Sequence, residues 1–122
     1  MKSYKELDAW KKSMELVKNV YLLIKLFPKE ELYALTSQLK RAASSVAANI
    51  AEGCGRGSDA DFSRFLLIAM GSASELEYHL LLARDLKFLS ETDYQKLDTA
   101  ATEVKRMLAS LIHKPRGRAA AG

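Results

Sequence analysis

Apolar residues recur every three or four positions along most of the chain, and no segment shows sustained alternation of apolar and polar residues. The first spacing is that of an amphipathic α-helix, whereas a half-buried strand requires the second. We therefore predict an all-α fold. Proline, glycine and serine divide the pattern into four helical segments.

The first helix is expected over residues 4–27, because Pro28 disfavours helical geometry in the residue before it. Its predicted inward seam has the three-and-four spacing of a heptad repeat and consists of Leu7, Trp10, Met14, Val17, Tyr21 and Ile24. A second apolar row beside this seam is assigned to surface beyond the core and consists of Ala9, Leu16, Val20, Leu23 and Phe27.

The second helix is expected over residues 30–52, either continuous or broken near Thr36. Gly53 is assigned the left-handed position that follows many helices. The predicted inward residues are Leu35, Leu39, Ala42, Ala43, Val46 and Ile50.

Ser58 followed by Asp61, and Ser90 followed by Asp93, resemble capping boxes with aspartate as the acid. They open a third helix that reaches about Lys87 and a fourth that ends before residues 114–115. The third helix is expected to bury Phe62, Phe65, Leu66, Ala69, Ala73, Leu76, Leu80 and Ala83. The fourth is expected to bury Tyr94, Leu97, Ala101, Val104, Leu108 and Leu111, with Leu89 stapled onto Tyr94.

Short connections make consecutive helices antiparallel neighbours, so the predicted architecture is an up-down-up-down four-helix bundle. A length of 122 residues fits one domain, which we place at residues 1–113, followed by a basic flexible tail at 114–122. The N-terminus has no apolar signal region, no apolar run approaches 18 residues, and there is one cysteine. These features favour a cytoplasmic protein without a membrane span.

The formal net charge of +4 is unevenly distributed. Residues 1–29 carry seven lysines against three acids, residues 57–113 carry six basic against nine acidic residues, and the tail adds three basic residues. The basic character therefore comes from one helix and one end of the chain, which weakens charge as an argument for nucleic-acid binding.

Two segments, SSVAANIAEG at residues 44–53 and GSASELEYHL at residues 71–80, resemble the bacterial four-helix-bundle family first noticed as the protein encoded in 23S rRNA intervening sequences. The resemblance covers about residues 3–112. The family often has proline where this chain has Ala47. The motif positions are Asn49, Ile50, Ala51, Glu52 and Gly53.

This resemblance implies a small cytosolic bundle that assembles as a ring, commonly a homopentamer, with no established enzymatic activity. A related branch of the family resembles the accessory proteins of diversity-generating retroelements, which engage a reverse transcriptase and RNA. The resemblance therefore keeps nucleic acid among the candidate partners.

Enzyme chemistry finds little support in the residues. His79 and His113 lack the Glu-x-x-His spacing of di-iron bundles. Cys54 has no partner cysteine, and we interpret it as a small buried residue. The run of Gly53, Gly55 and Gly57 lacks a nucleotide-fold context and is read as turn chemistry. No catalytic residue, metal, cofactor or small-molecule substrate is indicated.

Helical projection reveals apolar or small residues opposite the core stripes of the second and third helices. On a monomer such a surface would be a partner site, so we assign it to the interface of a closed homo-oligomer. The candidate interface residues are Ser44, Ala48, Ala51, Leu67, Gly71, Ser74, Tyr78 and Leu81.

Two readings of function remain open. The first is a self-assembling structural or adaptor scaffold of unknown physiological role, in which Arg41 and Glu52 form a polar network either on the surface or between subunits. The second is an accessory protein that binds the RNA or DNA backbone through basic residues of the ring. The candidate contacts are Lys11, Lys12, Lys18, Lys40, Arg41, Arg56, Lys114, Arg116 and Arg118.

Overall fold

A computed structural model of the protein describes residues 3–113, and within that range it contains helices and no strand. The all-helical prediction with four α-helices is confirmed there, while the predicted tail lies outside the described residues. In chain order the elements are η1 (Tyr4–Glu6), α1 (Asp8–Ile24), η2 (Lys29–Glu31), α2 (Leu35–Cys54), α3 (Asp59–Asp85) and α4 (Glu91–His113), where η marks a 3₁₀ helix.

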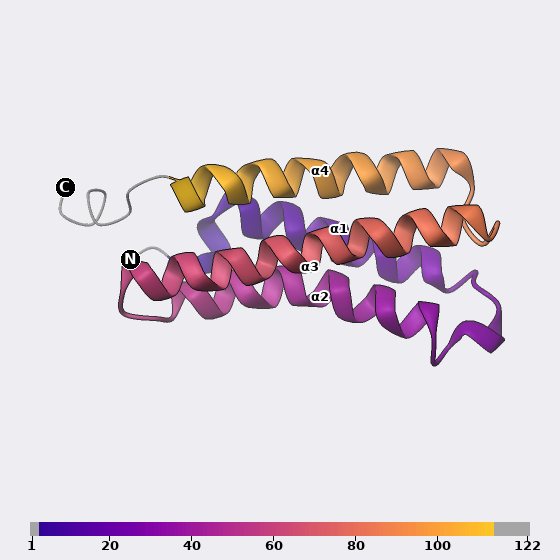
Figure 1. The fold of residues 1–122 in the computed structure, drawn as a ribbon, viewed down its shortest axis with the longest axis horizontal. Coiled ribbons are helices and arrows are strands. Elements are labelled where there is room, and N and C mark those ends of the chain that lie inside the picture. Colours follow the sequence, from indigo (N-terminus) through magenta and orange to yellow (C-terminus); the bar gives the residue numbers. More distant parts are fainter. Residues whose placement is uncertain (1–2, 114–122) are drawn as a thin grey trace.

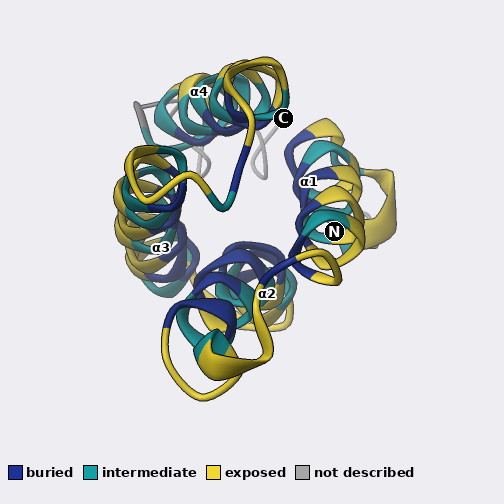
Figure 2. Cartoon of the chain, turned by 90° about the vertical axis from the view of Figure 1, so that its right-hand side faces the viewer, coloured by how far each residue is buried: buried dark blue, intermediate teal, exposed yellow. Residues whose placement is uncertain are grey.

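The four α-helices lie side by side around a common core (Figure 1). Each helix packs against two others: α2 lies between α1 and α3, and α4 lies between α3 and α1 (Figure 2). The α1–α2 and α3–α4 connections lie at one end of the molecule and the α2–α3 connection at the other (Figure 1). Every helix therefore has one face toward the core and one face toward the outside.

Serine side chains cap α3 and α4, as their sequences predict. Ser58 Oγ accepts a hydrogen bond from the Asp61 backbone N–H at 3.1 Å, and Ser90 Oγ accepts one from the Asp93 N–H at 3.0 Å. Each cap satisfies a donor that the first helical turn leaves without a partner. Local chemistry therefore sets where these two helices begin.

The buried face of α1 is not the predicted one. Of the predicted seam only Ile24 is buried, and Tyr21 is exposed. The row that was assigned to the surface supplies much of the core instead. The buried residues of this segment are Ala9, Ser13, Leu16, Val20, Ile24 and Phe27.

Side-chain size explains the different register of α1. Two small residues, Ala9 and Ser13, allow the neighbouring helices to approach closely, and the Ser13 hydroxyl donates a hydrogen bond to the Trp10 carbonyl at 2.8 Å. The serine is therefore buried without losing its hydrogen bond. Trp10 lies half-buried at the edge of the core, where its ring meets the Tyr4 ring edge-on at 5.1 Å.

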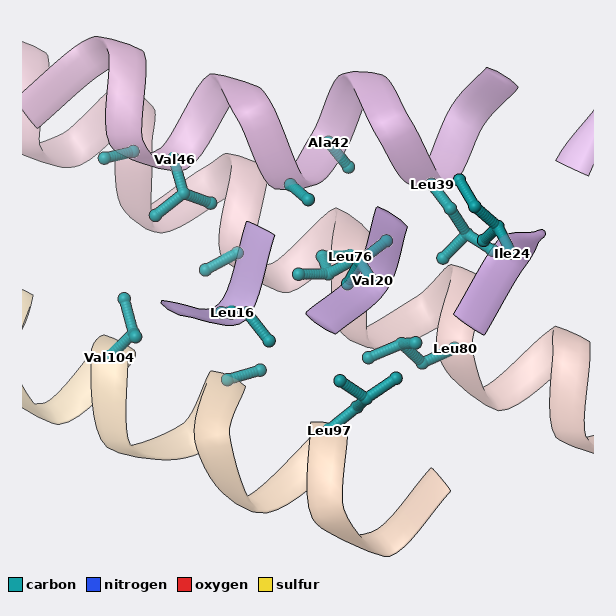
Figure 3. Close-up of a cluster of buried hydrophobic side chains, with 14 of the residues drawn as sticks. Leu16, Val20, Ile24, Leu39, Ala42, Val46, Leu76, Leu80, Leu97 and Val104 are labelled. Atoms are coloured by element: carbon teal, nitrogen blue, oxygen red, sulfur yellow. The ribbon is translucent and has the colours of Figure 1, made fainter. Parts of the chain in front are cut away.

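The predicted inward faces of the other three helices are confirmed. Every residue predicted for α2 and α3 is buried, and so is every one predicted for α4 except Leu111, which packs partly buried against the core. Leu16 and Val20 of α1 meet this core from the fourth side (Figure 3). The core is therefore continuous across all four helices.

Gly53 does not take the left-handed position predicted for it. It lies within α2, is buried, and has no positive φ. A Cβ at Gly53 would stand 2.9 Å from the Cβ of Phe65 in α3, closer than side-chain atoms approach one another. The glycine is therefore needed for the close approach of α2 and α3 and not for a turn.

A left-handed residue does end α3, and it is Lys87 with a φ of 68°. The Lys87 N–H donates to the Arg84 carbonyl at 3.0 Å, and the Phe88 N–H donates to the Ala83 carbonyl at 2.9 Å. This pair of bonds is the Schellman pattern that satisfies the last carbonyls of a helix. The helix consequently ends at Asp85, two residues before the predicted position.

By length and composition α3 is apolar enough to cross a membrane, and it is the one such helix among the described residues. The sequence pattern predicts no segment of this kind, so that prediction differs from the finding. The core helix of a bundle has the same composition. One side of α3, including Leu66, Leu76 and Leu80, is fully buried against the other helices, and that packing accounts for part of its apolar character.

Candidate functional site

An apolar row runs along the outside of α3. Leu67 is 57% exposed, Tyr78 is 58% exposed and Leu81 is 38% exposed, and Gly71 and Ser74 lie exposed between them. Large side chains at this exposure are unfavourable in water, whereas the outer face of α4 is polar. We call this row the α3 ridge.

The outer face of α2 is hollowed. An open groove of about 660 Å³ has Ser44, Ser45 and Ala48 along it, with Tyr21 of α1 and Tyr33 among its other lining residues. A second open hollow of about 560 Å³ continues past Ala48 and is lined by Ala51, Glu52, Gly55 and Arg56. We call this surface the α2 groove.

Small side chains give the α2 groove its depth. Ser44, Ala48 and Ala51 project little beyond the helix backbone, while the Tyr21 hydroxyl lies 3.3 Å from Ser44 Oγ. Tyr33, which is 91% exposed, also lines the groove. All candidate interface residues on α2 and α3 are thus exposed or half-buried, and they fall on two separate surfaces.

The basic residues predicted to contact nucleic acid are dispersed. Lys12 Nζ lies 3.6 Å from Glu103 of α4, and Arg56 lies 3.0 Å from Glu52, four residues earlier in the chain. Arg41 and Glu52 lie about three turns apart on α2, too far to pair within one chain, and Glu52 pairs with Arg56 instead. A network of Arg41 and Glu52 between subunits stays a prediction.

The remaining cationic candidates divide between two surfaces. Lys11 and Lys18 are exposed on α1. Arg41 and Lys40 line the larger, 660 Å³ part of the α2 groove, and no carboxylate lines that part. Lys40 Nζ lies 5.5 Å from the centre of the Tyr21 ring. Lys114, Arg116 and Arg118 lie outside the described residues.

The family motif residues hold α2 in place. Asn49 Nδ2 donates to the carbonyl and to the hydroxyl oxygen of Ser45, at 2.8 and 2.9 Å, and Ser45 Oγ lies 2.7 Å from Ser72 Oγ of α3. Ile50 and Gly53 are buried, and Ala51 and Glu52 face the groove. The motif therefore links the α2–α3 contact to the α2 surface.

Sites for catalysis or metal binding find no support in the described part of the chain. No group of three or more His, Cys, Asp or Glu side chains there is placed to hold a metal ion. Both ring nitrogens of His79 are buried without a hydrogen-bond partner among the described residues. Cys54 is half-buried and packs against the core, so it is less enclosed than the buried residue that the sequence predicts.

One acidic side chain is perturbed, but outside the hollows described above. Burial, together with the nearby Glu77 carboxylate, raises the pKa of Asp98 on α4. Glu77 itself accepts hydrogen bonds from Lys105 Nζ at 2.8 Å and Thr102 Oγ1 at 3.4 Å. These residues form a polar contact between α3 and α4 rather than a reactive site.

Sequence reasoning missed the aromatic part of the α2 groove. The apolar pattern predicts Tyr21 in the core and Leu32 and Tyr33 inside a helix, because periodicity alone does not fix the direction of these side chains; all three line the groove instead. The break near Thr36, which the sequence left open, was the available signal: residues 32–34 lie between η2 and α2 and turn these side chains outward.

A family model described as 23S rRNA-intervening sequence protein matches residues 5–110. The fold is also similar to the crystal structure of a protein with unknown function from the S23 ribosomal protein family of Bacteroides thetaiotaomicron. The two sequences are 31% identical, the TM-score is 0.78, and the match covers 87% of this chain and 99% of that chain. No curated protein matches the chain.

Proposed function

This chain belongs to the 23S rRNA-intervening sequence protein family, and we propose that it works as a non-enzymatic scaffold whose up-down-up-down bundles assemble into a closed homo-oligomeric ring. The observation that carries the proposal is the presence of two unlike, exposed surfaces on neighbouring helices, the α3 ridge and the α2 groove.

The two surfaces complement each other in shape. The ridge presents Leu67, Tyr78 and Leu81, whereas the groove presents small residues along α2. Small side chains on one helix let the large side chains of another approach its backbone. Removing apolar area of this kind from water stabilises an interface by about 25 cal/mol per Å² before the cost of association.

Charge sets the orientation of this contact. Lys40 and Arg41 border the groove, and Glu75 is exposed on α3 within one turn of Tyr78. Exposed ion pairs add little stability, about 0–1 kcal/mol each. They favour one register over others and speed association, so a neighbouring ridge would enter the groove with Glu75 toward these two cations.

A contact between two different surfaces is heterologous, and repeating it produces either a ring or an open filament. α2 and α3 are adjacent helices, so their outer faces point in different directions and not back to back (Figure 2). Each subunit added through such a contact is rotated relative to the one before it. This rotation favours a closed ring over a filament. The family resemblance supports five subunits in a cytoplasmic ring that presents repeated surfaces to a partner.

Paired interface variants test the proposal. Ala48→Arg fills the groove and Leu81→Lys charges the ridge, so each variant alone should be monomeric with its helical content retained. Mixed in equal amounts, they have one intact groove and one intact ridge between them and should form a 1:1 dimer. Thr99→Arg, on the outer face of α4, is the matched control and should leave the assembly unchanged.

Other outcomes would contradict the heterologous ring. If one of the two variants assembled like the wild type, the interface would use a single surface with itself. If the mixture stayed monomeric although each variant was folded by circular dichroism, ridge and groove would not be partners.

A second candidate function is binding of the RNA or DNA backbone. The observation that favours it is that Lys40 and Arg41 line the 660 Å³ part of the α2 groove and no carboxylate lines that part. Binding of this type is insensitive to base sequence and weakens steeply with salt. Anisotropy titrations of unrelated oligonucleotides with wild type, Arg41→Gln and a chain lacking residues 114–122 test it. Equal affinity of all three proteins would exclude contacts through Arg41 in the groove and through residues 114–122.

A further inference from the structure

A separate hollow of about 260 Å³ lies beside the connection between α1 and α2. Residues of the end of α1, of η2 and of the start of α2 line it, at the end of the bundle that faces the viewer in Figure 2. It shares Tyr21, Leu32 and Lys40 with the α2 groove, but Ser44, Ala48 and Ala51 do not line it. The two surfaces therefore have different chemistry.

Three cationic side chains converge on this hollow. Lys25 follows α1, Lys29 lies in η2 and Lys40 lies in α2, and no carboxylate lines the hollow. None of the three ammonium groups forms an ion pair with a described residue. Clustered cations without counter-charges attract an anion.

Thr36 supplies a polar group without a partner. The residue is only 5% exposed, it borders the hollow, and its hydroxyl makes no hydrogen bond to a described residue. The hydroxyl oxygen is not fully enclosed by the protein, so a molecule in the hollow can reach it. A ligand oxygen in the hollow would give Thr36 Oγ1 the acceptor that the protein does not provide.

The N-terminus of α2 also differs from those of α3 and α4. Ala34 precedes the helix and provides no side-chain cap, and the first turn contains no acidic residue. The first backbone hydrogen bond of the helix is donated by the Gln38 N–H to the Ala34 carbonyl at 3.0 Å. The amides of residues 35–37 therefore have no backbone carbonyl as acceptor among the described residues. Free amides and the helix dipole favour an anion at such an end.

We propose that this hollow binds the phosphate group of a phosphomonoester. The Thr36 hydroxyl and the first-turn amides of α2 donate hydrogen bonds to the phosphate oxygens, and Lys25, Lys29 and Lys40 neutralise their charge. Tyr21 and Leu32, which also line the hollow, offer an apolar surface for the organic part of the ester. The site uses none of the three small groove residues and does not depend on ring assembly.

Titration with defined probes tests the ligand class. Inorganic phosphate and adenosine 5′-monophosphate, added at low salt to the full-length protein labelled with ¹⁵N, should shift the amide signals of Thr36 and Ser37, whereas adenosine should not. Tighter binding of the nucleotide than of phosphate would identify an organic ester as the ligand, and equal binding would identify free phosphate. Shifts caused by adenosine alone, or by none of the probes, would overturn the proposal.

Matched variants test the residues. Thr36→Val removes the hydroxyl while keeping the shape of the side chain, and Thr36→Ser retains the hydroxyl. We expect phosphate binding to weaken about tenfold in the first variant, as for loss of a hydrogen bond to a charged group, and to persist in the second. Lys29→Gln should also weaken binding, whereas Lys96→Gln, on the exposed face of α4, should not.

Two results would contradict this assignment. Wild-type affinity in Thr36→Val would remove the hydroxyl from the site. An equal loss in Lys96→Gln and Lys29→Gln would indicate a response to overall charge. Because Lys29 lies in an exposed connection, its variant retains the fold and carries the test even if Thr36→Val is unstable.

Discussion

Gly53 of α2 lies so close to Phe65 of α3 that a Cβ on the glycine would stand 2.9 Å from the Phe65 Cβ. Phe65 Cβ is bonded directly to the backbone, so no change of rotamer moves it away. A second ring, that of Phe62, would lie 3.3 Å from the same added atom. The glycine that ends the family motif therefore fixes the spacing of two helices.

We predict that Gly53→Ala destabilises the protein by about 1 kcal/mol. Overpacking of a close contact costs roughly 1–3 kcal/mol, which exceeds the gain of about 1 kcal/mol from replacing glycine by alanine in a helix. The matched control is Gly71→Ala, where nothing lies within 4 Å of the added Cβ. That change should stabilise the protein, and opposite shifts of the urea midpoint would support the contrast.

Lys87 allows a second prediction about backbone geometry. Its φ of 68° is unfavourable for a residue with a side chain, at a cost of roughly 1 kcal/mol. We therefore expect Lys87→Gly to raise the free energy of unfolding by about that amount. Lys96→Gly, within α4, should lower it by a similar amount; thermal unfolding of the two variants should shift in opposite directions.

These two positions show what the sequence could and could not predict. Glycine after a helical pattern suggested a left-handed cap at Gly53, whereas the cap residue of α3 is a lysine that no composition rule singles out. Which glycine ends a helix and which permits a close contact depends on the neighbouring helix, and Phe65 lies twelve positions away in sequence.

The register of α1 was unpredictable for a related reason. This helix carries apolar residues on two neighbouring rows, so periodicity alone does not choose between them. The small pair Ala9 and Ser13 decides the choice, because it lets the other helices pack closely. The outer stripes of α2 and α3 were predictable because each has only one apolar row opposite its core. The position of Leu32 and Tyr33 beside the α2 groove was not predictable, because it depends on the path of residues 32–34 between η2 and α2.

The raised pKa of Asp98 leads to a prediction about pH. Burial and the Glu77 carboxylate disfavour the ionised form, so the folded state binds the proton more tightly than the unfolded state does. The free energy of unfolding should therefore fall as the pH rises from the ordinary value of 3.8 through the raised value. At a pH above the raised pKa, Asp98 is ionised in the folded state, and its unfavourable charge lowers the free energy of unfolding by the full amount.

Asp98→Asn should remove this contribution, so that the variant is more stable than the wild type at neutral pH and the difference vanishes in acid. Urea unfolding at several pH values measures it. Asp93→Asn is the contrasting change, since an acid in the first turn of α4 favours the helix dipole. That variant should lose about 0.3–1 kcal/mol at neutral pH, and a loss in both variants would contradict the assignment for Asp98.

The solution mass of the wild-type protein tests the central claim, ring assembly, most directly. Light scattering coupled to size exclusion, at micromolar concentration and physiological salt, should give one species whose mass is a whole multiple of 13.6 kDa, with five as the expected multiple. The value should stay constant on dilution and on raising the protein concentration, because a closed ring has no free surfaces to extend. A mass of 13.6 kDa throughout, or a mass that grows continuously with concentration, would contradict the closed ring.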